Sequence, residues 1–378
     1  MTIRKILALL AVLALFAAAC GDSDDGADDT TAAPDTTAAT TTEAPTTTEA
    51  PTTTEAPTTT EAPAPSIGTA DSPIEVLFVP SVSAEEIIAG GDLLKAALND
   101  ATGLEFNVSV GTSYASTIEE MCASPENTIG FIPAQGYVLA SDLCGVDIQL
   151  KSLRFGYTEY WTEFIAPRDS SLTSIFDLSG KKWAYPDATS TSGFLVPSGI
   201  FERFAINVGE SFEAGGHTAV VRAVYNGEAD FGTVFYSPQI DAEGNVIWDG
   251  TEGGADITAD AVETCVLDAD GEIECSGEYP RDARRNIREE NPDVIQQVKI
   301  FALSDPIPND GMAFGPEFPE DLKTQIVDAM TAFAENDPDT FSAAFDAYSW
   351  SGVAPTDDSE FDSIRALLQA LGFTLEDF

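Results

Sequence analysis

Short apolar segments alternate with helix-like segments in the first half of the folded chain, and this order restricts the folds open to it. The strand-like segments cover residues 74–79, 105–110 and 128–132. Segments with the apolar spacing of helices cover residues 84–101, 111–121 and 136–143. Because strands joined by helices pair in parallel, the pattern predicts an α/β fold with a parallel sheet covered by helices on both faces.

A second unit of the same kind follows along the chain. Its strand-like segments lie at residues 183–185, 230–235 and 298–303, and its helices are expected over 193–206 and 217–226. Residues 162–167 read as an extended segment that crosses between the two units, and 311–314 cross back. We therefore predict two lobes: residues 73–165 begin the first lobe, 166–305 form the second, and 306–378 return to the first.

The N-terminal 66 residues have a different character. Residues 1–20 place a basic start before an apolar run and end on small residues and Cys20, which predicts a lipoprotein signal peptide with Cys20 acylated. Ordinary signal cleavage beside an incidental cysteine is the alternative. Residues 21–66 contain four TTTEAP repeats and almost no apolar bulk, so we expect a disordered linker.

The charge of the chain restricts its partners. A formal net charge of −47 argues against nucleic acid and against an anionic membrane surface. We therefore expect membrane contact only through the lipid anchor, on the outer face of a bacterial cell membrane. A local cluster of donors can still bind an anion, since salt screens the long-range repulsion beyond roughly 8 Å.

Four cysteines remain once Cys20 is set aside. An even number in an exported chain predicts two disulfides. Three connectivities are possible, of which we favour Cys122–Cys144 and Cys265–Cys275. The second pair lies in a Gly-, Asp- and Glu-rich insertion over residues 240–282. Because no histidine or CxxC motif accompanies these cysteines, a metal site is the weaker alternative and no metal is predicted.

A hydroxyl-rich turn is the best candidate for a binding site. Ser190, Thr191 and Ser192 precede Gly193 at the start of a predicted helix, and the only histidine, His217, begins the next helix after two glycines. Unpaired N–H groups at a helix start attract anions, and the hydroxyls add donors. A plain helix cap and a core histidine are the alternative interpretations of these residues.

Five segments occur in the order and spacing of one known family. They read GTSYASTIE at 111–119, RDSSLTSIFDLSGKKWAY at 168–185, STSGFLVPSGIF at 190–201, GGHTAVVRAVYNGEADFG at 215–232 and SDPIPND at 304–310. Together they resemble the PhnD-like, phosphonate/phosphite-type solute-binding proteins of ABC transporters. The resemblance covers most of residues 74–378 apart from the insertion. It implies the two-lobed type II periplasmic-binding-protein fold, with two hinge crossings and a ligand cleft between the lobes.

The resemblance also implies roles for individual residues. The hydroxyl turn with Gly193 and His217 would hold the oxygens of the ligand, and Tyr114 with Tyr160 or Trp161 would close over it. Asp310 would hold an amine or accept a P–OH proton. Members that take aminoalkyl phosphonates have a further acidic residue where this chain has Ser237, which favours phosphite, methylphosphonate or phosphate as the ligand.

The sequence thus predicts a monomeric binding protein without cofactor. It would capture a small phosphorus oxyanion and deliver it to the permease of an ABC transporter and its ATPase, and it would not be an enzyme. Two alternatives come from other classes. One is an exported hydrolase that uses a serine with His217, although the chain lacks the G-x-S-x-G elbow. The other is a stalked surface protein with no small ligand.

Overall fold

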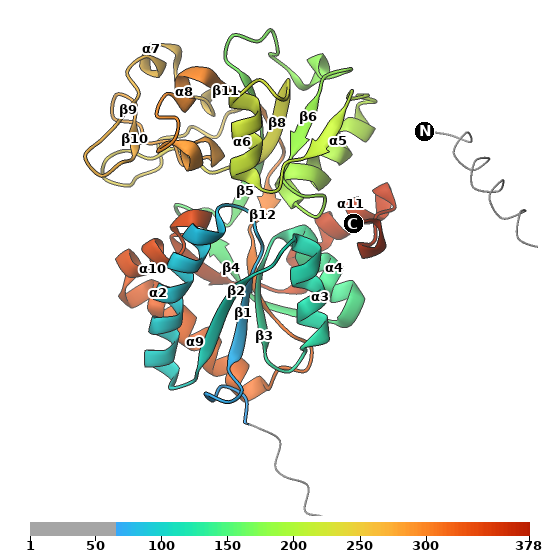
Figure 1. Ribbon diagram of the computed structural model, residues 1–378, viewed down its shortest axis with the longest axis vertical. Coiled ribbons are helices and arrows are strands. Elements are labelled where there is room, and N and C mark those ends of the chain that lie inside the picture. The colour runs from blue at the N-terminus through green and yellow to red at the C-terminus, as the bar shows by residue number, and fades with distance from the viewer. Residues whose placement is uncertain (1–65) are drawn as a thin grey trace, which may run out of the picture. The chain divides into compact units, whose positions relative to one another are not determined.

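The computed structural model describes residues 66–378, which form two α/β lobes (Figure 1). The predicted signal peptide, the lipidation site Cys20 and the linker up to residue 65 lie outside the described residues. Within residues 66–378, no helix has both the length and the apolar character that a membrane crossing requires.

The first lobe is built on a sheet with the strand order β14-β4-β13-β3-β1-β2. Its strands are β1 (Ile74–Phe78), β2 (Phe106–Val110), β3 (Thr128–Ile132), β4 (Asp147–Leu153), β13 (Gly311–Phe314) and β14 (Gly352–Pro355). Strand β1 pairs in parallel with β2 and β3, as the alternation of elements predicts. The returning strand β13 runs antiparallel to β3 and β4, so the sheet is mixed rather than wholly parallel.

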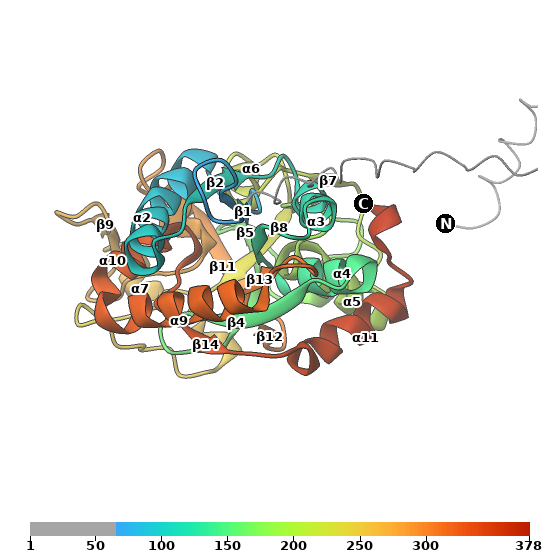
Figure 2. The same ribbon diagram turned by 90° about the horizontal axis from the view of Figure 1, so that it is seen from below.

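Helices cover both faces of this first sheet. They are α2 (Ala84–Thr102), α3 (Tyr114–Ala123), α4 (Ala134–Cys144), α9 (Glu320–Asn336), α10 (Pro338–Ala344) and α11 (Asp362–Leu371). Helices α2, α9 and α10 lie on one face, and α3, α4 and α11 lie on the other (Figures 1 and 2). The core between these layers is apolar, as a sheet buried on both faces requires.

The second lobe has the strand order β11-β5-β8-β6-β7, and β12 pairs with β5. Its strands are β5 (Glu159–Pro167), β6 (Trp183–Tyr185), β7 (Ser211–Glu213), β8 (Phe231–Tyr236), β11 (Val298–Leu303) and β12 (Ile307–Pro308). Its helices are α5 (Val196–Arg203), α6 (His217–Tyr225), α7 (Ala259–Val262) and α8 (Val294–Gln297).

The predicted lobe boundary at residue 165 falls inside β5, a central strand of the second sheet. Residues 162–167 were expected to cross between the lobes, but Phe164, Ile165 and Ala166 are completely buried between β8 and β11. Because it is paired on both sides, this segment is a central strand of the second sheet and not an exposed link between the lobes. The chain instead crosses at residues 154–158, and it returns at 309–310, directly before β13. Residues 311–314 therefore belong to the first sheet.

A tight turn forms the first crossing. Phe155 and Gly156 both have positive φ, at 51° and 85°, which is the pattern of a type I′ turn. The N–H of Arg154 donates to Tyr157 O over 2.9 Å, and the N–H of Tyr157 donates back over 3.0 Å. A left-handed conformation is costly for a bulky residue such as Phe155, so the surrounding structure must hold this turn in place.

The structure contains the two disulfides that local pairing predicts. Cys122–Cys144 joins the end of α3 to the end of α4, and Cys265–Cys275 closes a short loop in the insertion. In that loop, β9 (Val266–Leu267) and β10 (Ile273–Glu274) pair as a small antiparallel hairpin. The insertion therefore has a fixed local structure of its own.

Candidate functional site

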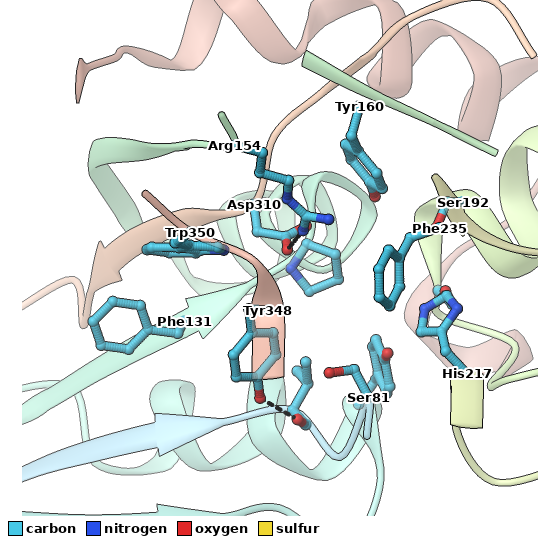
Figure 3. Close-up of a pocket in the computed structure, with 14 residues that line it drawn as sticks. Ser81, Phe131, Arg154, Tyr160, Ser192, His217, Phe235, Asp310, Tyr348 and Trp350 are labelled. Carbon is cyan, nitrogen blue, oxygen red and sulfur yellow. Dashed lines mark hydrogen bonds and ion pairs between the residues drawn. The ribbon is translucent and has the colours of Figure 1, made fainter. Parts of the chain in front are cut away.

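A small cavity lies between the two lobes (Figure 3). Its volume is about 30 Å³, on a scale on which one water molecule needs roughly 10–15 Å³. The first lobe and the crossings contribute Val79, Ser81, Tyr114, Phe131, Pro133, Arg154, Asp310, Tyr348 and Trp350, and the second lobe contributes Tyr160, Ser190, Ser192, His217 and Phe235. The cavity therefore suits a compact group of few heavy atoms.

The hydroxyl turn differs from the predicted start of an ordinary helix. Residues Thr191–Leu195 form a π-helical turn, and α5 begins only at Val196. Ser190 caps this turn, since its Oγ accepts from the N–H of Gly193 over 3.2 Å. Ser190 and Ser192 line the cavity, as predicted for ligand contacts. Their role in binding stays a prediction.

Thr191 and Gly193 do not line the cavity, contrary to the expectation that the whole turn faces the ligand. The Thr191 hydroxyl points across to the first lobe, where it accepts from the N–H of Gln135 over 2.7 Å. Gly193 packs so closely on Pro186 that a Cβ there would lie 2.3 Å from the proline ring. Consecutive residues of a helical turn point their side chains in different directions, so only some of these hydroxyls can reach one cavity.

His217 is the first residue of α6 and is buried at the cavity wall. Its Nε2 lies 3.5 Å from Ser190 Oγ. Burial, together with the positive charge of Arg154, lowers the pKa of His217 to about 3, so the ring is neutral at pH 7. No residue in the described part of the chain bonds to its Nδ1. Within residues 66–378, the pair thus lacks the carboxylate that orients the histidine of a hydrolytic triad.

Arg154 is a cavity residue that the sequence analysis missed. Its Nη2 forms an ion pair with Asp310, and its guanidinium carbon lies 4.5 Å from the ring centre of Tyr160 and 5.5 Å from that of Phe235. Nε and Nη1 of Arg154 are buried without a partner among the described residues. Asp310 lines the cavity, as predicted, but Arg154 already occupies one of its oxygens.

The predicted aromatic residues do not all reach the cavity. Tyr114 and Tyr160 line the cavity, and burial raises the pKa of both phenols, which therefore stay protonated. Trp161 does not line it, because neighbouring residues of a strand point to opposite faces. Its ring instead packs on Trp248, with centroids 4.8 Å apart.

Near the end of β8, Phe235 rather than Ser237 lines the cavity. Ser237 was matched to the acidic position of relatives that take aminoalkyl phosphonates, but it is buried away from the cavity. Phe235 occupies the wall there, and its ring contacts His217 with centroids 5.1 Å apart. The second lobe therefore places an aromatic ring, and not a carboxylate, against this part of the cavity.

Direct hydrogen bonds hold the two lobes together around the cavity. The N–H of His217 donates to Ser81 O over 2.7 Å, and Arg285 of the second lobe donates to Asp346 of the first over 2.6 Å. Gly216 has a φ of 138°, and a Cβ at this position would lie 3.1 Å from Ser81 O. These contacts describe a closed arrangement of the lobes.

The polar groups of the cavity favour an anion over a metal ion as the ligand. In the stretch from residue 66 to 378, no group of three His, Cys, Asp or Glu side chains is placed to hold a metal ion. The polar groups of the cavity are hydroxyls, an imidazole and one Arg–Asp pair. This donor set suits an anion better than a metal.

Two α/β lobes, joined by two crossings and enclosing a small polar cavity, define a solute-binding protein of the type II periplasmic class. Residues 76–361 match the family described as "ABC transporter, phosphonate, periplasmic substrate-binding protein". The chain belongs to this family, which confirms the resemblance drawn from its motifs.

Known relatives agree with this assignment. The "Phosphate-import protein PhnD" of Mycolicibacterium smegmatis is 27% identical over an alignment of 178 residues, and the match covers 43% of this chain and about half, 54%, of that protein. A phosphonate-transporter binding protein of Pseudomonas aeruginosa has 18% identity and a TM-score of 0.58, covering 78% of this chain and 84% of that one. PhnD1 of Prochlorococcus marinus, solved with methylphosphonate, has 12% identity and a TM-score of 0.59, covering 79% and 98%. At these identities the two structures support the fold alone.

Proposed function

We propose that the protein is an extracytoplasmic, lipid-anchored solute-binding protein that captures a small phosphorus oxyanion and delivers it to an ABC transporter permease. Phosphate, phosphite and phosphonates are the candidate ligands. Membership of the family supports the transport role. The lipid anchor rests on Cys20 and the apolar segment before it, and the linker would hold the folded part away from the membrane.

One observation carries the ligand assignment. Three residues that line the cavity, drawn from both lobes, carry buried polar atoms without partners among residues 66–378: the hydroxyl of Ser81, Nη1 of Arg154 and Nδ1 of His217. An unsatisfied buried polar group costs about 1–3 kcal/mol, so a cluster of them is expected where a ligand completes the hydrogen bonds. An oxyanion has acceptors on every side and would satisfy all of them, with charge-assisted bonds from Arg154.

Ligand binding would be linked to closure of the lobes. In this proposal, the lobes rotate about the crossings at 154–158 and 309–310, and the closed form is recognised by the permease. The ligand favours closure because only the closed form brings His217 and Ser190 close to Arg154.

Calorimetric titration of the full chain, solubilised in detergent, tests the proposal. Phosphate, phosphite, methylphosphonate and 2-aminoethylphosphonate are titrated in turn, and at least one should bind tightly without being consumed. Absence of binding to all four compounds would overturn the ligand assignment, and turnover of a phosphoester that His217→Ala abolishes would favour a hydrolase. Cys20→Ala in a bacterial host should release the protein from the membrane fraction, which tests the anchor separately.

A further inference from the structure

Arg154 occupies an unusual position for a binding-site cation. It directly precedes the two positive-φ residues of the first crossing, and its backbone closes that turn with two hydrogen bonds. The N–H of Phe155 also donates to Ser351 Oγ over 2.8 Å. Backbone strain that the surroundings hold in place is typical of functional positions. The turn therefore fixes the start of the Arg154 side chain.

Contacts along the side chain fix the guanidinium as well. Asp310 pairs with Nη2, and the rings of Tyr160 and Phe235 flank the group. Nε and Nη1 remain as buried donors without partners in the described chain. A planar guanidinium held in this way keeps its charge and its remaining donors in fixed positions, so less entropy is lost when they bind. It can therefore bind an oxyanion as a preformed cation.

The negatively charged group of the cavity is already paired with a cation of the protein. Of the described residues that line the cavity, only Asp310 carries a carboxylate, and it pairs with Arg154. Phe235 lines the cavity from the second lobe, and Ser237, which matches the acidic position of relatives that take aminoalkyl phosphonates, does not line it. An ammonium group on a ligand would therefore find no unpaired carboxylate and would lie close to a fixed positive charge, which is unfavourable in a buried site.

The aromatic walls of the cavity also limit the size of the ligand, and this too disfavours a ligand with an amino tail. The cavity of about 30 Å³ is bounded by Phe131, Tyr348 and Trp350 on the side of the first lobe and by Phe235 on the other (Figure 3). Phe131 and Trp350 are themselves packed together, with centroids 5.5 Å apart. Rings that pack on one another cannot easily move aside for a tail.

We propose that Arg154 determines the ligand class: it neutralises a compact phosphorus oxyanion and, by engaging Asp310, excludes ligands with an amino tail. This inference rests on the proposed function. It ranks phosphate, phosphite and methylphosphonate above 2-aminoethylphosphonate. Loss of Arg154 frees Asp310, which then accepts an ammonium group, so the preference between the two kinds of ligand changes and does not merely weaken.

The test is calorimetry of the full chain and of Arg154→Gln, Arg154→Lys and Arg203→Gln with phosphate and 2-aminoethylphosphonate. Arg203 is exposed at the end of α5 and serves as the matched control. We expect the unaltered chain to bind phosphate at least about tenfold more tightly than it binds 2-aminoethylphosphonate. Arg154→Gln should weaken phosphate binding about 30-fold or more, the loss of a charge-assisted bond, and bring the two affinities closer together. The affinity of Arg154→Lys for phosphate should lie between those of the unaltered chain and Arg154→Gln, since lysine keeps the charge but lacks the planar donor geometry of the guanidinium.

Several outcomes separate this inference from the proposed function. If the unaltered chain binds phosphorus oxyanions but prefers 2-aminoethylphosphonate, the inference is wrong and the proposed function stands. The inference is also wrong, and the proposed function still stands, if Arg154→Gln and Arg203→Gln bind phosphate with equal affinity. If the chain binds none of these ligands, the proposed function fails and the inference with it. Circular dichroism establishes that each variant is folded, and if Arg154→Gln is not, the ligand ranking of the unaltered chain and the loss in Arg154→Lys decide.

Discussion

The sharpest prediction concerns Gly216, where the start of α6 meets the first lobe. In Gly216→Ala, the new methyl group would lie 3.1 Å from Ser81 O and 3.3 Å from Pro80 O, both backbone atoms of the other lobe. Gly215→Ala is a matched control: Gly215 also has positive φ, at 90°, but its Cβ would meet nothing within 4 Å. Both substitutions carry a backbone cost of about 1–3 kcal/mol. Only Gly216→Ala pushes the lobes apart.

The expected size of the effect follows from the contact that is lost. Separation of the backbones lengthens the 2.7 Å hydrogen bond from the N–H of His217 to Ser81 O. Such a bond contributes about 0.5–1.5 kcal/mol, and 1.4 kcal/mol corresponds to about tenfold in affinity. Gly216→Ala should therefore bind phosphate about tenfold more weakly than Gly215→Ala, as measured by calorimetry, while the two unfold at similar temperatures. Equal affinities of the two variants would refute the link between this contact and closure.

Three further predictions concern pH, salt and disulfides. The pKa of His217 in the folded chain lies below its unfolded value of roughly 6.5, so the unfolded chain takes up a proton as the pH falls from there towards 3 and stability falls with it. His217→Gln should flatten this slope in urea unfolding between about pH 7 and pH 5. Asp346→Asn removes the partner of Arg285 across the lobes and should weaken phosphate binding a few-fold, with less dependence on salt than in the unaltered chain. Replacement of Cys122 and Cys144 by serine should cost roughly 3 kcal/mol in urea unfolding, because the bridge spans 22 residues.

Each of these predictions has an outcome that contradicts it. An unchanged pH slope in His217→Gln would mean that another group titrates in this window. An Asp346→Asn variant with unaltered affinity at low salt would show that the Arg285 contact does not influence closure; Asp362→Asn, which loses an exposed pair within one lobe, is its control. A cysteine double variant as stable as the parent would contradict the loop-closure argument.

Periodicity predicted the strands and helices well, but not the point where the chain changes lobe. The segments assigned as β1, β2 and β3 agree with the structure, because alternation of short apolar runs with helices is a strong local signal. The lobe boundary depends on which strand pairs with which. Nothing local in residues 159–167 distinguishes an extended link from a central strand, and only the pairing with β8 and β11 settles it.

The residues of the cavity were predicted only in part, because here too the missing information lies in tertiary pairing. Ser190, Ser192 and His217 stand out because hydroxyl clusters and a single histidine are visible in the sequence. Arg154 has no such signature, since it is one cation after a strand and its partner Asp310 lies 156 residues further on. Tertiary pairing of this kind cannot be read from local composition.

The ion pair between Arg154 and Asp310 has a consequence for the order of events in capture. Arg154 follows β4 and Asp310 precedes β13, two strands of the first sheet, so the pair braces both crossings at the same corner. In the proposed opening of the lobes, this corner would move with the first lobe, while Ser190, Ser192 and His217 would move with the second. In the proposed function, an arriving anion would first meet the preformed cation Arg154 on the first lobe, and the hydroxyls and the imidazole of the second lobe would reach it only on closure.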